Sequence, residues 1–256
     1  MGNSVNGFKR NDGNPANKSH LGYTMEELEK RIGYHFVNQE LLRQALTHSS
    51  FSNEQKPGVH IKDYERIEFL GDAVLEVVVS DYLYHSNLNI PEGELTKMRA
   101  SMVCEPSLAF CARDIELGKY MFMGKGEENT GGRERDSIIA DGMEAVIGAL
   151  YLDSGMEEAK KFIFRFILND LEDKQLFFDS KSTLQEVAQG RFKSGVRYES
   201  VGEKGPEHDK TFTMKVWIGN ECMGEGYGRT KKAAEQQAAY QALLKLREKG
   251  YVLKKY

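Results

Sequence analysis

Apolar residues recur at helical spacing along the first two thirds of the chain. Thr24 to Glu27 form a capping box, which begins a short helix carrying Leu28 and Ile32 on its apolar side. Asn38 is placed to cap a second helix. Helical spacing then continues to about residue 155, and a last amphipathic helix covers roughly residues 156–170. Because no segment alternates as a strand would, this part of the chain predicts an all-α domain.

The pattern changes beyond residue 175. Alternating apolar and polar residues now mark three short strands, and Gly224, Gly226 and Gly228 in the third indicate close packing of its backbone. The order α-β-β-β-α over about seventy residues predicts a small α+β domain. The expected elements are a helix over 183–192, strands over 196–201, 212–218 and 222–227, and a final helix from the cap Thr230 to about 248.

These patterns divide the chain into five parts. Residues 1–20 are rich in Asn, Gly and Lys, and we expect them to be a disordered tail. The other expected parts are the all-α domain over 21–171, a linker over 172–180, the α+β domain over 181–249 and a tail over 250–256.

The formal net charge of −4 hides an uneven distribution. Residues 1–20 carry a net +2, residues 21–175 a net −11 and residues 176–256 a net +5. A basic C-terminal part suits a polyanionic partner, whereas an acidic body repels one unless bound cations screen it. Charge alone is equally compatible with two domains of different surface charge and no nucleic acid.

The cysteines and the hydropathy indicate a cellular location. The chain has three cysteines without CxxC spacing, which suits reduced thiols. No stretch approaches the roughly 18 apolar residues of a membrane span, and no secretory h-region is visible. We therefore expect a cytoplasmic protein without a membrane partner.

The helical segment 64–79 carries an unusual acidic strip. Glu65, Glu68, Asp72 and Glu76 fall within about 80° of one another on the helix, and the other faces are mostly apolar. Like charges at this spacing destabilise a helix by a few tenths of a kcal/mol per pair, and partial burial raises that cost. No lysine or arginine lies on the strip itself.

A second, nearly apolar segment over 137–148 contains only Asp141 and Glu144 as charged groups, three residues apart and so on one face. Glu92 and Glu94 begin another helix, where the helix dipole alone explains them. Each acidic strip could be the solvated face of an ordinary helix. The alternative is that the two strips face each other around divalent cations, and hard oxygen ligands favour Mg²⁺, with Mn²⁺ able to substitute.

Several ordered motifs resemble those of the ribonuclease III family. The string YERIEFLGDAVL at 64–75 resembles the family signature, and residues 183–248 resemble the double-stranded-RNA-binding domain that follows the nuclease domain in bacterial members. Supporting motifs are ALTHSS at 45–50, EGE at 92–94 with MR at 98–99, GGRER at 131–135, ADGMEA at 140–145, LQE at 184–186, GPEH at 205–208 and KKAAE at 231–235.

The resemblance implies roles for the acidic residues. The implied metal ligands are Glu68, Asp72, Asp141 and Glu144. Asp72, Glu144 and Glu65 are expected to take part in catalysis, and Glu65 and Glu92 match further acidic positions of a supporting kind. Members of the family form homodimers through the nuclease domain. They cleave double-stranded RNA by two-metal chemistry, leaving 5′-phosphate and 3′-hydroxyl ends with short 3′ overhangs, and they process ribosomal and other structured RNAs.

The resemblance also implies which residues contact RNA. Gln185, Glu186 and His208 would reach the minor groove and its 2′-hydroxyls. Lys231 and Lys232 lie in the first turn of the last helix, where free backbone N–H groups and two ammonium groups suit a phosphate. The simpler interpretation of the lysines is an exposed start to a surface helix.

Two other functions remain open at this point. One is a regulator that binds RNA duplexes without cutting them, although every acidic position of the motifs is occupied. The other is a metal-independent nuclease that uses histidine acid–base pairs and leaves cyclic phosphates, but the chain has six histidines and His48 alone lies in a nuclease motif.

Overall fold

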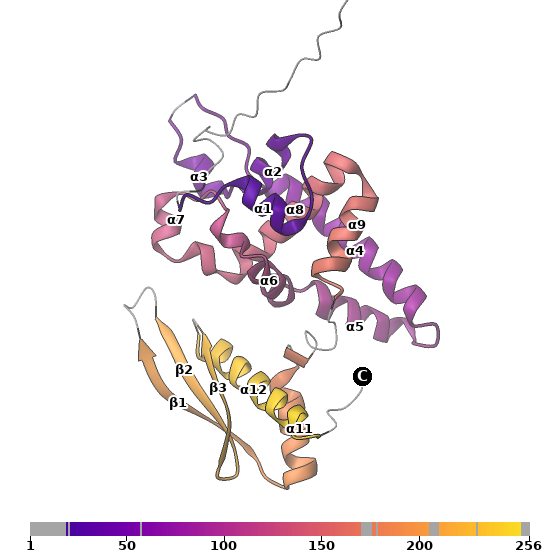
Figure 1. Cartoon of the computed structure of the whole chain (residues 1–256), viewed down its shortest axis with the longest axis vertical. Coiled ribbons are helices and arrows are strands. Elements are labelled where there is room, and N and C mark those ends of the chain that lie inside the picture. The colour runs from indigo at the N-terminus through magenta and orange to yellow at the C-terminus, as the bar shows by residue number, and fades with distance from the viewer. Residues whose placement is uncertain are drawn as a thin grey trace, which may run out of the picture.

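The structure is a computed structural model that describes residues 19, 21–56, 58–169, 176–177, 179–204, 210–228 and 230–251. The described chain forms a helical domain followed by a three-stranded sheet with two helices (Figure 1). This confirms the predicted fold class. The tail predicted over 1–20 lies outside the described residues apart from Ser19, as do most of the predicted linker and C-terminal tail.

The described residues of the helical domain form α-helices and two short 3₁₀ turns. Their bounds are α1 Met25–Ile32, α2 Gln39–Ala45, α3 Ser49–Asn53, α4 Glu65–Ser86, α5 Glu92–Val103, α6 Glu105–Asp114, η2 Leu117–Lys119, α7 Lys125–Asn129, η3 Gly132–Glu134, α8 Asp136–Ser154 and α9 Met156–Phe166.

The helix starts follow the predicted capping residues. The Thr24 hydroxyl and the Glu27 side chain form the reciprocal capping box of α1, and the Asn38 side chain accepts from the Glu40 N–H at the start of α2. Both predictions are confirmed. The last helix of the domain ends at Phe166, a few residues earlier than the periodicity suggested.

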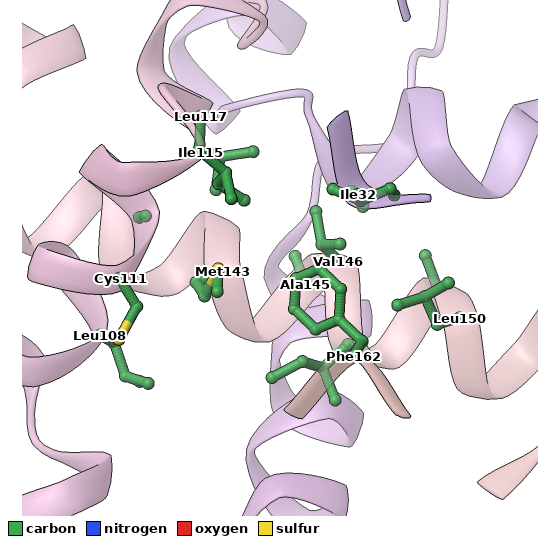
Figure 2. Close-up of a cluster of buried hydrophobic side chains, with 14 of the residues drawn as sticks. Ile32, Leu108, Cys111, Ile115, Leu117, Met143, Ala145, Val146, Leu150 and Phe162 are labelled. Carbon is green, nitrogen blue, oxygen red and sulfur yellow. The ribbon is translucent and has the colours of Figure 1, made fainter. Parts of the chain in front are cut away.

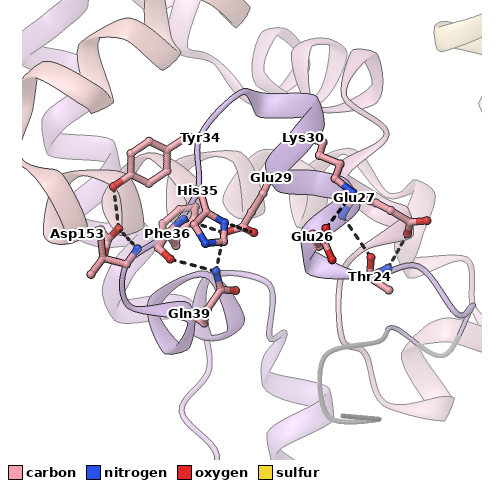
Figure 3. A network of polar contacts seen from close by, with 11 residues as sticks. Thr24, Glu26, Glu27, Glu29, Lys30, Tyr34, His35, Phe36, Gln39 and Asp153 are labelled. Atoms are coloured by element: carbon pink, nitrogen blue, oxygen red, sulfur yellow. Dashed lines mark hydrogen bonds and ion pairs between the residues drawn. The ribbon is translucent and has the colours of Figure 1, made fainter. Parts of the chain in front are cut away.

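Two carboxylates hold the loop between α1 and α2 (Figure 3). Glu29, which is buried, accepts from the Phe36 N–H at 2.7 Å. Asp153 at the end of α8 accepts from the N–H groups of Val37 and Asn38 at 2.8 and 2.9 Å. These bonds satisfy backbone donors of the loop and attach it to the central helix.

Helix α8 runs through the centre of the core. Its side chains pack against α1, α6 and α9, and the cluster has almost no solvent exposure (Figure 2). The residues labelled there are Ile32, Leu108, Cys111, Ile115, Leu117, Met143, Ala145, Val146, Leu150 and Phe162. Since α8 is apolar on nearly all sides, Asp141 and Glu144 are exceptions within a buried helix.

Helices α4 and α8 touch backbone to backbone. A Cβ atom on Gly71 of α4 would lie 1.8 Å from the carbonyl oxygen of Glu144, and one on Gly148 of α8 would lie 2.3 Å from the carbonyl oxygen of Ile67. Only glycine allows this approach at either position. The crossing therefore brings the acidic strips of the two helices together.

The C-terminal domain has the predicted element order, with α11 Ser180–Phe192, β1 Val196–Lys204, β2 Thr211–Ile218, β3 Glu221–Gly228 and α12 Lys231–Glu248. The strands pair antiparallel in the order β1-β2-β3. Helix α11 begins three residues earlier than predicted, and each strand is longer than predicted, because strand pairing and tertiary packing extend elements beyond their local pattern.

Helix α12 packs on the sheet through small residues. Ala234, Ala238 and Ala242 are fully buried, and Cβ atoms on Gly224 and Gly226 would lie within 2.4 Å of the α12 backbone. The close packing predicted for the glycines of β3 is confirmed. The Thr230 hydroxyl accepts from the Ala233 N–H, as expected for the cap of α12.

Across the described part of the chain, helices that combine the length and the hydropathy of a membrane span are absent.

Candidate metal centre and RNA-binding surface

The α4–α8 crossing brings three carboxylates together. Glu68 from α4 and Asp141 and Glu144 from α8 each offer an oxygen atom, and these three atoms lie within 4.8 Å of one another. All three residues are partly buried. The acidic strips that the sequence predicted on two separate helices therefore meet. The hypothesis of a shared metal site required this meeting, whereas strips that merely faced solvent would not have needed to meet.

Burial and mutual repulsion disfavour the charged forms of these carboxylates. Burial, followed by the charges of Asp141, Glu65 and Asp72, raises the pKa of Glu68 to about 7. Burial, followed by the charges of Asp72 and Glu68, raises the pKa of Glu144 to about 8. The pKa of Asp141 is also raised, mainly by burial.

The donor set fits a hard divalent cation. Within the described residues, no lysine or arginine forms an ion pair with Glu68, Asp141 or Glu144. The charge of His48 favours the ionised form of Asp141, but burial outweighs it and the pKa of Asp141 stays raised. Half-buried carboxylate oxygens without a lysine or arginine partner are the ligands that Mg²⁺ and Mn²⁺ prefer. A bound cation would remove the repulsion that raises the pKa values.

Asp72 lies one helical turn after Glu68, and its side chain is exposed. It is not one of the three residues whose ligand atoms lie within 4.8 Å. Its charge nevertheless raises the pKa of both Glu68 and Glu144, so it faces the same site. Asp72 is thus placed at the open edge of the cluster.

Glu65 and Glu92 are the two supporting acidic residues that the resemblance implies. Glu65 is exposed at the first turn of α4, and its charge contributes to the raised pKa of Glu68. Glu92 is exposed at the start of α5, where its carboxylate accepts from the Thr96 hydroxyl at 2.8 Å. Neither residue belongs to the three-carboxylate group.

A basic residue from another helix reaches the end of the acidic strip. The strip itself carries no lysine or arginine, as the sequence shows, but Arg99 of α5 forms an ion pair with Glu76 at 2.8 Å and donates to Ser80 at 3.0 Å. The basic partner comes from another helix, which the spacing within α4 could not reveal. Glu76 is therefore paired with a cation, although its charge still contributes to the raised pKa of Glu144.

Tyr64, the first residue of the family-like string, has a contact with the cluster that no local pattern in the sequence indicates. Its side chain is 4 % exposed, and its hydroxyl donates to Oδ2 of Asp141 at 3.4 Å. Burial, followed by the charges of Asp141 and Glu68, raises the pKa of Tyr64 above its ordinary value, so the hydroxyl keeps its proton. The ring packs edge-on against His48, with centroids 5.7 Å apart.

The predicted RNA-binding residues lie on the C-terminal domain. Gln185 and Glu186 are exposed on α11, and Lys231 and Lys232 are exposed in the first turn of α12. His208 lies outside the described residues.

Lys231 lies near the end of the sheet where β1 and β2 are joined. Its ammonium group is 5.8 Å from the centroid of the Phe212 ring and 3.8 Å from a Glu203 carboxylate oxygen. Glu203 and Phe212 are register partners at that end of the sheet. The start of α12 therefore lies beside the end of the sheet that Glu203 and Phe212 form.

Family models match both parts of the chain. A model described as "Ribonuclease-III-like" matches residues 38–171, and one described as "Double-stranded RNA binding motif" matches residues 180–246. These matches cover the three-carboxylate cluster and the exposed residues on α11 and α12, respectively.

Curated relatives align along most of the chain. A "Ribonuclease 3" from Caldanaerobacter subterraneus subsp. tengcongensis is 49 % identical over 222 residues, covering 86 % of this chain and 96 % of the relative. A second "Ribonuclease 3", from Listeria monocytogenes, is 47 % identical over 223 residues, covering 86 % of this chain and 97 % of the relative.

A solved structure resembles the helical domain. The nuclease domain of ribonuclease III from Campylobacter jejuni, described as flexible in a region involved in dimer formation, is 43 % identical and superposes with a TM-score of 0.54. The match covers 58 % of this chain and 99 % of that one.

Proposed function

Because the chain belongs to the ribonuclease III family, we propose that it cuts RNA duplexes with divalent cations held by Glu68, Asp72, Asp141 and Glu144. The double-strand-specific endoribonuclease activity itself follows from the family matches and the full-length relatives. Enzymes of this family depend on divalent metal. The convergence of Glu68, Asp141 and Glu144 at the α4–α8 crossing is the observation that carries the proposal.

The proposed cofactor is Mg²⁺, and Mn²⁺ is expected to replace it. Two bound ions would supply a hydroxide-forming water near neutral pH and stabilise the charge on the leaving 3′-oxygen. Glu68, Asp141 and Glu144 act as ligands rather than proton carriers, and Asp72 completes the set from the open edge. Glu65 and Glu92 add negative charge around the ligands and support the site from outside it.

The product ends follow from this chemistry. Hydrolysis in which the 3′-oxygen is the leaving group produces 5′-phosphate and 3′-hydroxyl ends. The proposed homodimer makes two offset cuts, one in each strand, and these give short 3′ overhangs. We propose ribosomal precursors and other structured RNAs as substrates. Their processing is typical of the family.

The exposed apolar side of α4 supports a homodimer. Phe69 is 79 % exposed and Val77 is 59 % exposed, and both lie on the side of α4 adjacent to the acidic strip. Exposed apolar patches of this kind mark interaction sites, and a helix face that pairs with itself suits twofold symmetry. Sedimentation of the Phe69→Ser variant should show a weakened dimer, and a wild-type dimer constant would argue against this face.

The C-terminal domain is the proposed duplex-binding module. Lys231 and Lys232 would neutralise phosphates at the start of α12, and Gln185 and Glu186 on α11, with His208, would contact the minor groove. Such binding is largely independent of sequence and weakens steeply with salt. The non-cleaving regulator is not favoured, because both family matches and the full acidic set accompany this module.

The location is proposed to be the cytoplasm. The three cysteines Cys104, Cys111 and Cys222 are free in the structure, which suits a reducing compartment.

The deciding experiment is cleavage of a long RNA duplex by the full chain, with Mg²⁺, with Mn²⁺ and with chelator, followed by mapping of both product ends. We expect cutting with either metal, none with chelator, and 5′-phosphate ends. Cyclic phosphates, or cleavage that persists in chelator, would refute the metal mechanism. Glu144→Gln serves as the matched variant, which should bind duplex but not cut it.

A further inference from the structure

The cluster has a neutral hydrogen-bond donor at its inner end. Among the described residues, Tyr64 forms a side-chain hydrogen bond with Asp141, in which its hydroxyl donates to Oδ2 at 3.4 Å. We infer that Tyr64 is a positioning residue of the metal centre, whose hydroxyl occupies one oxygen of Asp141 and fixes the carboxylate for cation binding. This inference rests on the proposed role of Asp141 as a metal ligand.

Tyr64 is held from several directions. Its N–H donates to the Thr47 carbonyl at 2.9 Å, and its own carbonyl accepts from the Glu68 N–H at 2.8 Å. Its ring is 4 % exposed and lies edge-on to the His48 ring. The hydroxyl therefore has little freedom, and one residue contacts two proposed ligands, Asp141 through its side chain and Glu68 through its backbone.

The hydroxyl of Tyr64 is a hydrogen-bond donor without a positive charge, and this affects cation binding. A lysine or arginine at this place would neutralise Asp141 and compete with a divalent cation, whereas a tyrosine hydroxyl orients the carboxylate without adding charge. The 3.4 Å separation is longer than the roughly 2.7 Å typical of O–H···O bonds, so its stability contribution is small. Its effect is on orientation. Ligating carboxylates are usually hydrogen-bonded in this way, and loss of such a partner costs about 10–100-fold in metal affinity or activity.

The test compares Tyr64→Phe with Tyr34→Phe in the full chain. Tyr34 also donates to an aspartate on α8, Asp153, at 2.7 Å, but that residue is about 18 Å along the helix from Asp141. Both variants keep the ring and lose one tyrosine–aspartate bond. Mn²⁺ affinity is measured by titration with paramagnetic detection of the free ion, without RNA, alongside thermal unfolding in chelator.

We expect Tyr64→Phe to bind Mn²⁺ about tenfold more weakly and to need correspondingly more Mg²⁺ for half-maximal cleavage, with the rate recovered at high metal. Tyr34→Phe should bind Mn²⁺ as the wild type does. Wild-type Mn²⁺ affinity in Tyr64→Phe would overturn the inference, as would an equal loss in both variants, which indicates a general structural effect.

Asp141→Asn separates this inference from the proposed ligand set. If Asp141→Asn loses Mn²⁺ affinity while Tyr64→Phe does not, the positioning role fails and the ligand assignment stands. If Asp141→Asn binds Mn²⁺ like the wild type, the ligand assignment fails and the inference about Tyr64 falls with it.

Discussion

The contact between α4 and α8 gives the sharpest expectation, because a single methyl group should separate the acidic residues. In Gly71→Ala, the new Cβ would begin 1.8 Å from the Glu144 carbonyl oxygen and 2.6 Å from its carbonyl carbon. Real Cβ atoms essentially never approach closer than 3.0 Å, and both atoms belong to backbone that cannot rotate away. The helices must therefore separate by at least about 1.2 Å, the difference between that limit and the starting contact.

That displacement acts on stability and catalysis together. Overpacking of a core costs about 1–3 kcal/mol, and the better helix propensity of alanine returns roughly 0.5–1 kcal/mol. Misplacement of catalytic groups by about 1 Å costs about a hundredfold in rate. Since Gly71 lies between Glu68 and Asp72 on the same turn, the separation moves both away from Glu144.

The assay is duplex cleavage at saturating Mg²⁺, combined with urea unfolding of the same preparations. We expect at least about a hundredfold loss of turnover in Gly71→Ala. Gly148→Ala, whose Cβ would lie 2.3 Å from the Ile67 carbonyl oxygen, tests the same crossing from the other side. Gly195→Ala is the control, because its Cβ would also meet nothing within 4 Å and it lies outside α11 and α12, so turnover should not change. Wild-type turnover in Gly71→Ala would refute this account of the site.

Three further outcomes are expected. In chelator, the free energy of unfolding of Glu144→Gln should equal that of the wild type near pH 4.5 and exceed it by on the order of 1–2 kcal/mol near pH 8. The reason is that the Glu144 carboxyl has a pKa of about 8 in the folded state, so its ionisation destabilises the fold as the pH rises through that window. A stability difference that does not change with pH would contradict the burial of this group. Asp72→Asn should lose cleavage by on the order of 100-fold or more while keeping duplex affinity, measured by electrophoretic shift, and normal turnover would remove it from the ligand set. Replacing Lys231 or Lys232 by Ala should weaken duplex binding and reduce the slope of log affinity against log salt by about 1 for each lysine, whereas Lys249→Ala at the far end of α12 should leave the slope unchanged.

Interactions between residues close together in the sequence determined much of the secondary structure of this protein. The Thr24 capping box, the Asn38 and Thr230 caps, and the alternation in β2 act between residues a few positions apart, so periodicity and capping rules predict them from the sequence. The presence of carboxylates on two nearly apolar helices was also visible, because any such residue violates the pattern around it.

Helix and strand ends were less predictable. Helix α11 starts at Ser180, where the side chain is buried and its hydroxyl donates to the Gln236 carbonyl of α12 at 3.0 Å. A contact between helices 56 residues apart thus extends α11 beyond its local signals. The longer strands have the same origin, since each gains ladder bonds from its neighbours.

Only the tertiary structure decided which charges meet. Glu76 shares the strip of Glu68, but Arg99 reaches it from α5, whereas Glu68 meets Asp141 and Glu144 instead. Tyr64 and Asp141 are 77 residues apart, and no periodicity relates them. Helical spacing predicts the direction in which a side chain points from the axis of its helix. Which group that side chain contacts depends on how closely, and at what angle, another helix crosses. Here, Gly71 and Gly148 set that distance through backbone contact.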